Sequence, residues 1–339
     1  MKAILCTSPG GPEVMNLGEM PLPEIGPHEV LVKVRAAGVN RADLLQRQGL
    51  YPPPAGASEL LGLECSGTVV AVGGNVGDWA PGDEVCALLT GGGYAEFVAV
   101  PQGQVMPVPP GLDLTSAAGL PEVACTVYSN LAMGANLTAG EWLLIHGGGS
   151  GIGTFAIQWA KAIGAKVVVT AGSEEKLQRC RDLGADAAIN YRTEDFPAAV
   201  REVTGKHGAD VILDIIGAKY LDANVRSLAR SGRLVIIGLQ GGIRAELDLG
   251  RLLAKAGTIQ ATSLRARPAA EKAAICARVV EHVWPLVAEG RIKVVVDRVL
   301  DLEFAADAHA AIAAGDHVGK VLLVVAGGEY HSHAVAGGN

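Results

Sequence analysis

The stretch His146-Gly147-Gly148-Gly149-Ser150-Gly151-Ile152-Gly153 decides the fold of this chain. An apolar segment, Trp142 to Ile145, precedes it, and apolar residues recur at helical spacing from Ile152 to Ile163. A strand, a glycine turn and a helix form the phosphate-binding corner of a dinucleotide fold. The glycines let the backbone approach a pyrophosphate, and the helix N-terminus offers free N–H donors. The sequence therefore predicts a dinucleotide site, with Ser150 at the central position that is usually glycine.

The residues after the second strand bear on the choice of cofactor. A site for NADH usually places Asp or Glu at the end of this strand, residues 166–170, where it binds the ribose hydroxyls. This chain has Ala171-Gly172-Ser173 there, followed by Lys176, so no carboxylate repels a 2′-phosphate and a cation is near. The sequence predicts NADPH as the cofactor. The alternative is that Lys176 is a solvated residue of the next helix.

Length and composition predict two domains around a large core. The chain has 339 residues, of which 49% are hydrophobic and 19% charged. The net charge of -7 gives no electrostatic support for general nucleic-acid binding. Six scattered cysteines favour reduced thiols in a cytoplasmic protein. The N-terminus is typical of a strand rather than a signal peptide, and no apolar run is long enough to span a bilayer.

The first third of the chain predicts a closed or rolled β structure, because short strands are separated by frequent Gly and Pro turns. The expected strands are Glu29–Val39, Gly67–Val72, Glu84–Leu88 and Tyr94–Val100. From about Leu120 onward, strands alternate with helices, and near-continuous apolar strands favour a parallel, doubly wound sheet. Its later strands are expected at Ala187–Asn190, Val211–Ile216, Leu234–Ile237 and Thr258–Thr262.

The last part returns to mixed elements that we expect to fold back onto the N-terminal domain. These are a helix at Ala269–Glu289, a strand at Lys293–Val296, a helix at Phe304–Ala314 and a strand at Lys320–Val325. The predicted domains are 1–121, 122–266 and 267–326, where the third range rejoins the first. Residues 327–339 are expected to be a disordered tail, and His331 and His333 within it are more typical of that tail than of a metal site.

Several motifs in the right order resemble those of the medium-chain dehydrogenases/reductases, and most of all the zeta-crystallin-like quinone oxidoreductases. The matching motifs are Gly10–Glu13, Ala37–Asp43, Gly49–Pro52, Gly62–Glu64, Gly82–Val85, Thr170–Ser173 and Gly319–Val321. The resemblance implies a GroES-like β domain beside a Rossmann domain, with the active site in the cleft between them. It also implies a homodimer or homotetramer in which the last Rossmann strand often pairs across the interface.

Many relatives in this superfamily hold a catalytic zinc, which needs three protein ligands and an open position. The resemblance places Asn40 and Leu63 where zinc relatives have a ligand Cys and a ligand His, and Glu122 at the third position. Because leucine cannot ligate a metal and two ligands are replaced, we expect no zinc. The closely spaced cysteines of the structural zinc lobe are missing as well.

Without a Lewis acid a simple ketone is hard to reduce, whereas a quinone is electron-poor and needs mainly proximity, orientation and donors near the developing oxyanion. The candidate catalytic residues are Tyr51 and Asn40, which the resemblance places near the nicotinamide and the quinone. Asp43 is a candidate to orient Asn40 or to relay a proton. The alternatives are a packing aromatic for Tyr51, a turn former for Asn40, and for Asp43 a cap on a helix running to Gln48.

The candidate cofactor residues fall into three groups. Those expected at the pyrophosphate are Gly148, Ser150, Gly151, Ile152, Gly153 and Thr154. Those expected at the phosphorylated ribose are Gly172, Ser173, Lys176 and Tyr191. By resemblance, Tyr128, Gly238, Leu239, Gln240, Thr262, Ser263 and Leu264 border the path from adenosine to nicotinamide. The alternatives are helix packing for Tyr128 and ordinary strand ends for the others.

The function expected from these features is zinc-independent, NADPH-dependent reduction of a quinone by direct hydride transfer. One alternative is reduction of an activated C=C bond in a 2-alkenal or an enoyl thioester, for which Tyr51 would donate the proton. The other is a non-catalytic, crystallin-like protein that binds a nucleotide or RNA. The acidic balance and the absence of a basic aromatic motif make RNA binding unexpected, and the intact cofactor corner argues against a purely structural role. The expected partner is a small-molecule quinone, and no membrane partner is expected.

Overall fold

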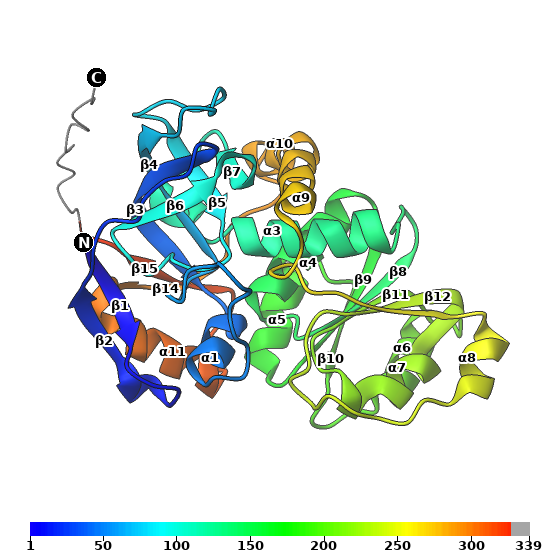
Figure 1. The fold of residues 1–339 in the computed structure, drawn as a ribbon. Helices are drawn as coiled ribbons and strands as arrows, with labels where there is room; N and C mark the ends of the chain where they lie inside the picture. Colours follow the sequence, from blue (N-terminus) through cyan, green and yellow to red (C-terminus); the bar gives the residue numbers. More distant parts are fainter. Residues whose placement is uncertain (327–339) are drawn as a thin grey trace, which may run out of the picture.

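A computed structural model describes residues 1–326 and shows two sheets side by side, each with its own helices (Figure 1). One is a six-stranded sheet of order β10-β9-β8-β11-β12-β13, in which every pair of neighbours is parallel. The chain order reverses between β8 and β11, as in a doubly wound dinucleotide-binding sheet. Its strands are β8 (Trp142–His146), β9 (Lys166–Ala171), β10 (Ala187–Asn190), β11 (Ala209–Asp214), β12 (Leu228–Ile236) and β13 (Thr258–Ala261).

Helices cover both faces of this sheet. Leu143 and Ile145 of β8 belong to one apolar core, and Leu144 between them belongs to another, because side chains alternate along a strand. Phe196 packs into the second core. The covering helices are α4 (Gly151–Ala162), α5 (Glu174–Asp182), α6 (Phe196–Val203), α7 (Leu221–Ser227) and α8 (Leu249–Lys255). The predicted parallel, doubly wound sheet is confirmed.

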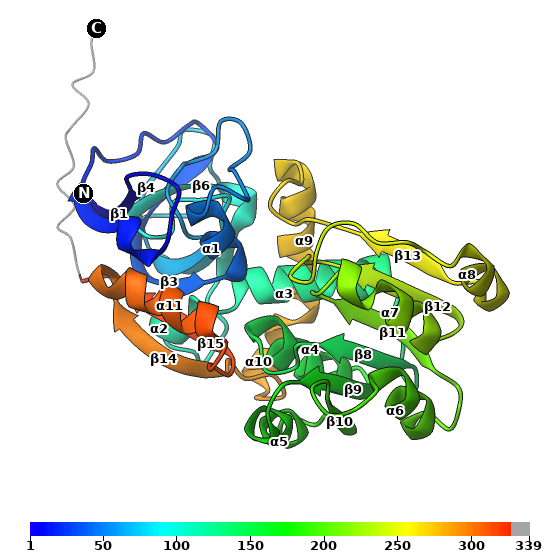
Figure 2. The same ribbon diagram turned by 90° about the horizontal axis from the view of Figure 1, so that it is seen from below.

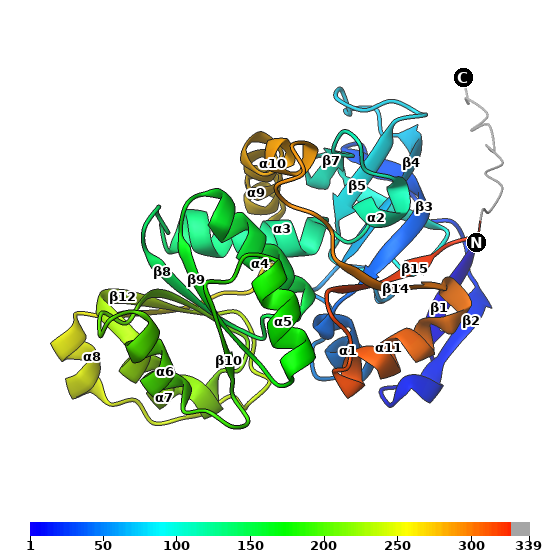
Figure 3. The same cartoon turned by 180° about the vertical axis from the view of Figure 1, so that it is seen from behind.

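The other sheet joins the two ends of the chain. Its order is β14-β15-β3-β4-β5-β7, with β6 also paired to β3. The strands are β3 (Glu29–Val39), β4 (Glu64–Val72), β5 (Glu84–Leu88), β6 (Phe97–Pro101), β7 (Val105–Pro107), β14 (Val296–Asp301) and β15 (Lys320–Val324). Figure 3 shows β14 and β15 beside β3. Because Val321 pairs with Val39 in an antiparallel register, the C-terminal segment lies within the N-terminal β unit.

Smaller elements complete this β unit. A hairpin of β1 (Lys2–Cys6) and β2 (Met15–Glu19) forms a separate two-stranded sheet. Two helices, α1 (Arg41–Arg47) and α11 (Ala305–Ala314), lie beneath the main sheet, and α2 (Leu114–Ala117) packs on β3 and β4. The single-turn 3-10 segments of the chain are Pro12–Val14, Gln102–Gln104, Ala218–Tyr220 and Leu302–Phe304.

Three helices lie between the two sheets, as Figures 1 and 2 both show. They are α3 (Pro121–Val127), which continues as a π-helix over Tyr128–Gly134, α9 (Ala269–His282) and α10 (Trp284–Ala288). One apolar core runs through this junction, since it contains Met106 of the β unit, Ile145 of the parallel sheet and Cys276 of α9. The two units therefore share a core as well as a boundary.

Two predicted elements differ from the structure. The helix expected over 269–289 is two helices that meet at Val283, because Pro285 lacks the N–H needed to continue the hydrogen-bond ladder. The strand expected over 293–296 begins only at Val296. The backbone of Lys293 is instead bonded through both its N–H and its carbonyl to the side chain of Gln158, at 2.9 and 3.0 Å.

Two further observations concern the whole described chain. None of the helices within residues 1–326 combines the length and the apolar character needed to cross a membrane. All six cysteines are free thiols. The predictions for the tail 327–339, including His331 and His333, fall outside the described residues.

Candidate cofactor and substrate site

The glycine-rich turn at the end of β8 forms the predicted corner. Ser150 is the N-cap of α4, and its hydroxyl accepts from the Gly153 N–H at 3.0 Å and donates to the Gly147 carbonyl at 2.7 Å. A Cβ at Gly153 would lie 2.4 Å from that carbonyl oxygen, so only glycine fits there. Thr154 is buried and its hydroxyl bonds to the Gly151 carbonyl at 3.1 Å. The turn has the tight backbone that a pyrophosphate site needs.

The C-terminal segment of the β unit packs directly against this turn. The Gly319 N–H donates to the Gly149 carbonyl at 2.9 Å, and Gly319 forms an isolated parallel bridge with Ser150. Gly319 has a φ of +89°, and a Cβ there would lie 2.2 Å from the Val295 carbonyl oxygen. The stem of Lys320 passes so close to Gly151 that a Cβ on Gly151 would lie 2.6 Å from it. The dipeptide Gly319-Lys320 thus borders the cofactor corner.

The residues expected at the phosphorylated ribose lie together at the end of β9. Ser173 is the N-cap of α5 and accepts from the Lys176 N–H at 3.4 Å. Tyr191 follows β10 and lies against Gly172. A Cβ on Gly172 would lie 2.5 Å from the Tyr191 hydroxyl oxygen. The ammonium of Lys176 donates to the carbonyl of Gly315. These residues gather a hydroxyl, a phenol and a cation at the predicted place.

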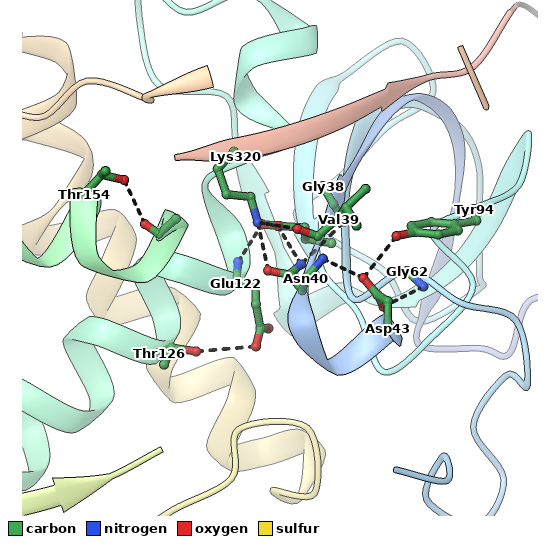
Figure 4. A network of polar contacts seen from close by, with 12 residues as sticks. Gly38, Val39, Asn40, Asp43, Gly62, Tyr94, Glu122, Thr126, Thr154 and Lys320 are labelled. Carbon is green, nitrogen blue, oxygen red and sulfur yellow. Dashed lines mark hydrogen bonds and ion pairs between the residues drawn. The ribbon is translucent and has the colours of Figure 1, made fainter. Parts of the chain in front are cut away.

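Four residues from distant parts of the chain form a polar group, which we call the lysine cluster: Asn40, Glu64, Glu122 and Lys320 (Figure 4). Glu64 and Lys320 are buried, and Asn40 and Glu122 are partly buried. The Lys320 ammonium lies 2.5 Å from Glu64 Oε1 and 2.8 Å from Asn40 Oδ1. The Asn40 amide donates to the same Glu64 oxygen at 2.9 Å. The Glu122 N–H donates to Glu64 Oε2 at 2.9 Å. The amide that was predicted to face the substrate is therefore already bonded to Glu64 in this structure.

The lysine cluster contains one more carboxyl group than cations. Burial, together with the charge of Glu64, raises the pKa of Glu122 to about 8, although Lys320 opposes the shift. A hydrogen bond from Thr126 at 3.4 Å is the one side-chain contact to the Glu122 carboxyl among the described hydrogen bonds. Near neutral pH the Glu122 carboxyl accordingly carries a proton. The cluster then holds one carboxylate, one ammonium and one neutral acid.

Asp43 holds the backbone of one member of the lysine cluster, Asn40. It is fully buried, and its carboxylate accepts from the Asn40 N–H at 2.8 Å, from the Gly62 N–H at 3.1 Å and from the Tyr94 hydroxyl at 3.2 Å. Burial raises its pKa to about 6. Asp43 holds the backbone of Asn40 as the third residue of α1, so the capping alternative describes its contacts; the helix ends at Arg47 rather than Gln48.

Tyr51 connects the β unit to the end of β13. Its hydroxyl lies 2.9 Å from the hydroxyl of Ser263, and its carbonyl accepts from Arg265 at 3.4 Å. The guanidinium carbon of Arg265 lies 5.4 Å from the centre of the Tyr51 ring. The structure therefore brings together Tyr51 and Ser263, which the sequence predicted for the catalytic and cofactor groups respectively.

The other predicted cofactor residues lie at strand ends or in the junction. Tyr128 contacts Trp159 edge-on and stacks on His282, which matches the packing alternative. Gly238, Leu239 and Gln240 follow β12, and the Gln240 N–H donates to the Ile215 carbonyl at 3.2 Å. Thr262 donates to Asn130 at 2.6 Å, and Leu264 is buried.

Sequence reasoning did not assign a role to Glu64 or Lys320. Both stand in motifs that carried the family resemblance, Gly62–Glu64 and Gly319–Val321, so the signal was present in the sequence. Their contact was not predictable, because β4 and β15 lie at opposite ends of the chain and each pairs with β3.

The residues at the positions that zinc relatives use do not fit a zinc ion. Leu63 is apolar and buried, and Asn40 is bonded to the Lys320 ammonium, which already places a positive charge there. A zinc site needs three donors from Cys, His or carboxylate side chains. Within residues 1–326 no group of three such side chains is arranged to hold a metal.

Comparison with known families matches both units. Residues 26–110 match the alcohol dehydrogenase GroES-like domain, and residues 151–278 match the zinc-binding dehydrogenase family. The α/β fold, with a GroES-like β unit beside a Rossmann sheet, is confirmed. Fold and site together define an oxidoreductase of the medium-chain dehydrogenase/reductase superfamily.

Similar proteins indicate to which family of this superfamily the chain belongs. A quinone oxidoreductase of Pseudomonas aeruginosa is 32% identical over 325 residues, which are 95% of this chain and 99% of that protein. A solved structure of Escherichia coli quinone oxidoreductase with NADPH is 30% identical, with a TM-score of 0.85 over 96% of this chain and 100% of that one. An NAD-dependent alcohol dehydrogenase structure is 34% identical, with a TM-score of 0.86 over 96% and 100% of the two chains. The chain belongs to the quinone oxidoreductase family.

Proposed function

We propose that this protein is a zinc-independent quinone reductase that uses NADPH and transfers a hydride directly to the quinone. One observation carries the proposal. The dipeptide Gly319-Lys320 contacts the glycine turn through its first residue and Asn40 through its second. The cofactor corner and the candidate catalytic residue are therefore linked through one dipeptide, which supports a cofactor and a substrate bound next to each other.

The preference for NADPH rests on residues of this chain. Similar structures include both an NADPH complex and an NAD-dependent enzyme, so they do not decide the cofactor. Ser173, Lys176 and Tyr191 would hold the 2′-phosphate, since Ala171-Gly172-Ser173 at the end of β9 contains no carboxylate to repel it. The turn from Gly148 to Thr154 would hold the pyrophosphate. Bound NADPH would supply the hydride.

The residues of the β unit would act on the quinone. Reduction places negative charge on a carbonyl oxygen, and donors fixed near that oxygen lower the barrier. Tyr51 offers a hydroxyl that now contacts Ser263 at 2.9 Å, and Lys320 places an ammonium beside Asn40. Asp43 is a positioning residue, because it holds the Asn40 backbone and contacts neither of those groups.

The first test is oxidation of NADPH with 1,2-naphthoquinone in the presence of a chelator, beside NADH and beside a 2-alkenal. Chelator-resistant quinone turnover that favours NADPH is the expected result. Turnover with the alkenal alone would keep the fold and the cofactor but replace the substrate class by activated C=C bonds. Cofactor binding without either turnover would leave a non-catalytic, crystallin-like role.

The change Tyr51→Phe tests the proposed donor within this reaction. Removal of the hydroxyl is expected to lower kcat with the quinone by about tenfold or more, because a transition-state donor is lost. The affinity for NADPH should stay within about twofold, measured by fluorescence titration, since a conservative exchange at one hydroxyl leaves the phosphate sites intact. Ser263→Ala is the matched control, because it frees the hydroxyl of Tyr51 without removing it. Unchanged steady-state kinetics in Tyr51→Phe would remove this residue from the mechanism.

A further inference from the structure

Two buried cations stand beside Tyr51 without a carboxylate partner. Arg265 follows β13 and is 5% exposed, and Lys272 lies in the first turn of α9 and is 4% exposed. Arg265 donates to the carbonyls of Thr90 at 2.8 Å and Tyr51 at 3.4 Å. Lys272 donates to the Thr90 hydroxyl at 2.6 Å and to the Arg265 carbonyl at 3.3 Å. All of these acceptors are neutral.

Such an arrangement is unusual for buried charges, which are normally paired with an opposite charge. The lysine cluster follows this rule, because Lys320 pairs with Glu64 at 2.5 Å. Among the ion pairs of residues 1–326, neither Arg265 nor Lys272 takes part in one. Burial lowers the pKa of both groups, and Arg265 Nη2 has no hydrogen-bond partner.

The carboxyl group of Glu122 does not neutralise these two cations. It interacts with both electrostatically but is hydrogen-bonded to neither of them. Because its own pKa is raised to about 8, it carries a proton near neutral pH. Asp43 also acts electrostatically on Arg265, but its hydrogen bonds go to Asn40, Gly62 and Tyr94, so neither cation has a direct ion-pair partner among the described residues.

The two cations line a pocket of about 590 Å³. Its other walls include Ser58, Thr90 and Gly92 of the β unit. This volume suits a small organic ligand, for which pockets of roughly 300–1,000 Å³ are typical. The residues of the glycine turn do not line it, so the cofactor phosphates belong elsewhere.

Four further charged groups belong to residues on the same pocket, and one of them is the N-terminal ammonium of Met1, which donates to the Met20 carbonyl at 2.6 Å. Arg267 is paired with Glu271 at 3.7 Å. Glu29 accepts from the Gly26 N–H at 2.8 Å, and Glu24 is exposed. Neither Glu24 nor Glu29 forms an ion pair among the described residues, but neither is buried, so the buried unpaired charges of this pocket are those of Arg265 and Lys272. Tyr51 is not among the residues that line the pocket, but the guanidinium carbon of Arg265 lies 5.4 Å from the centre of the Tyr51 ring, so Arg265 connects the pocket with the proposed catalytic residue.

We propose that Arg265 and Lys272 bind the anionic substituent of the substrate, so that the preferred substrates are quinones carrying a carboxylate or sulfonate group. This inference rests on the proposed quinone reduction and names its substrate class. The anion would supply the direct ion-pair partner that neither cation has among the described residues, and it would orient the quinone ring toward Tyr51. A charge-assisted contact of this kind contributes about 1.5–3 kcal/mol, or about tenfold to a hundredfold in affinity.

The kinetic test compares 1,2-naphthoquinone with 1,2-naphthoquinone-4-sulfonate. The ratio of their kcat/KM values is measured in the wild type and in Arg265→Met and Lys272→Met. Each exchange is expected to lower the preference for the sulfonate, given by its kcat/KM divided by that of 1,2-naphthoquinone, by about tenfold. Arg267→Met is the matched control, because this cation belongs to the same segment but already has Glu271 as a partner. A ratio that is the same in all four proteins would overturn the proposal.

A binding test separates this inference from the proposed reaction. Calorimetry compares naphthalene-1-sulfonate with its neutral analogue naphthalene-1-sulfonamide on the wild-type protein, where the sulfonate is expected to bind about tenfold more tightly. Equal binding would overturn the anion site even in an active quinone reductase. Tighter sulfonate binding in a protein without quinone turnover would support the anion site and reject the proposed reaction. This comparison needs no variant, so it does not depend on whether Lys272→Met folds.

Discussion

The cofactor corner and the lysine cluster are built in opposite ways. The corner comes from one continuous run, residues 146–176, and depends on backbone groups, glycines and two helix N-caps. The lysine cluster takes one residue each from four separate segments, and it depends on the buried ion pair of Glu64 and Lys320. A continuous backbone motif can form its geometry locally, whereas a buried charge cluster exists only when the whole fold is in place.

The two regions should therefore respond differently to substitution. In the corner, a lost side chain removes one contact with the ligand and leaves the backbone unchanged. In the cluster, a lost side chain leaves a partner charged, buried and without compensation, which destabilises the whole protein. Variants of each region can show whether this difference is real.

The largest expected effect is that of Lys320→Met. The exchange leaves Glu64 fully buried without its ammonium partner, so we expect the free energy of unfolding to fall by about 3–5 kcal/mol. For a chain of this length that loss corresponds to a decrease in Tm of about 5 °C. Thermal unfolding followed by circular dichroism measures it.

A double variant sharpens this result. Lys320→Met combined with Glu64→Gln removes both charges and is expected to recover about half or more of the lost stability, because no ion is then left unpaired. If the double variant were as unstable as the sum of the two single variants, the two charges would not be coupled. The contrast with the cofactor corner would then lose its basis.

The second effect concerns the corner and the variant Lys176→Ala. Loss of the cation is expected to raise the KM for NADPH about tenfold or more while the KM for NADH changes little, because only NADPH carries the 2′-phosphate. The Tm should stay close to that of the wild type. Lys161→Ala is the control, since this exposed lysine pairs with Asp186 at the other end of α4. Equal effects on the two cofactors would contradict the assignment.

The smallest effect is a gain in stability from Glu122→Gln, and it depends on pH. The folded protein holds the pKa of Glu122 at about 8, mainly through burial, whereas the ordinary value is 4.5. Between these two values the unfolded chain ionises and the folded one does not, so this group lowers stability as pH rises from 4.5 to 8. The glutamine lacks this titration and is expected to raise the Tm at pH 9.

The pH series provides the control for this variant. At pH 5 the Glu122 carboxyl of the folded wild type is protonated and uncharged, like the glutamine of the variant. The stabilities of the two proteins should therefore differ least at this pH. Asp43 shifts in the same direction, to about 6, but it is present in both proteins and cancels in the difference. A variant that is less stable than the wild type at pH 9 would show that Glu122 is ionised and favourably paired.

The comparison also explains what the sequence could predict. The strand, glycine turn and helix around Ser150 and Gly153 were predicted correctly, because this geometry is set by neighbours within a few residues. The contact between Lys320 and Asn40 was out of reach, since it follows from β15 pairing with β3. The strand expected at Lys293 failed for a related reason, because the side chain of Gln158 satisfies that backbone. Local signals predicted the corner, and tertiary pairing produced the cluster.

The pairing of β15 with β3 also bears on the order in which the chain folds during synthesis. The parallel sheet from β8 to β13 is complete in the sequence before β14 and β15 are made. The N-terminal strands must wait for those last residues before their sheet has both of its outer strands. Until β15 is made, the part of β3 from Ala36 to Val39 has one unpaired edge, and exposed strand edges promote aggregation. A ribosome that stalls after β13 would therefore release a chain with a formed Rossmann sheet and a β unit whose unpaired strand edge promotes aggregation.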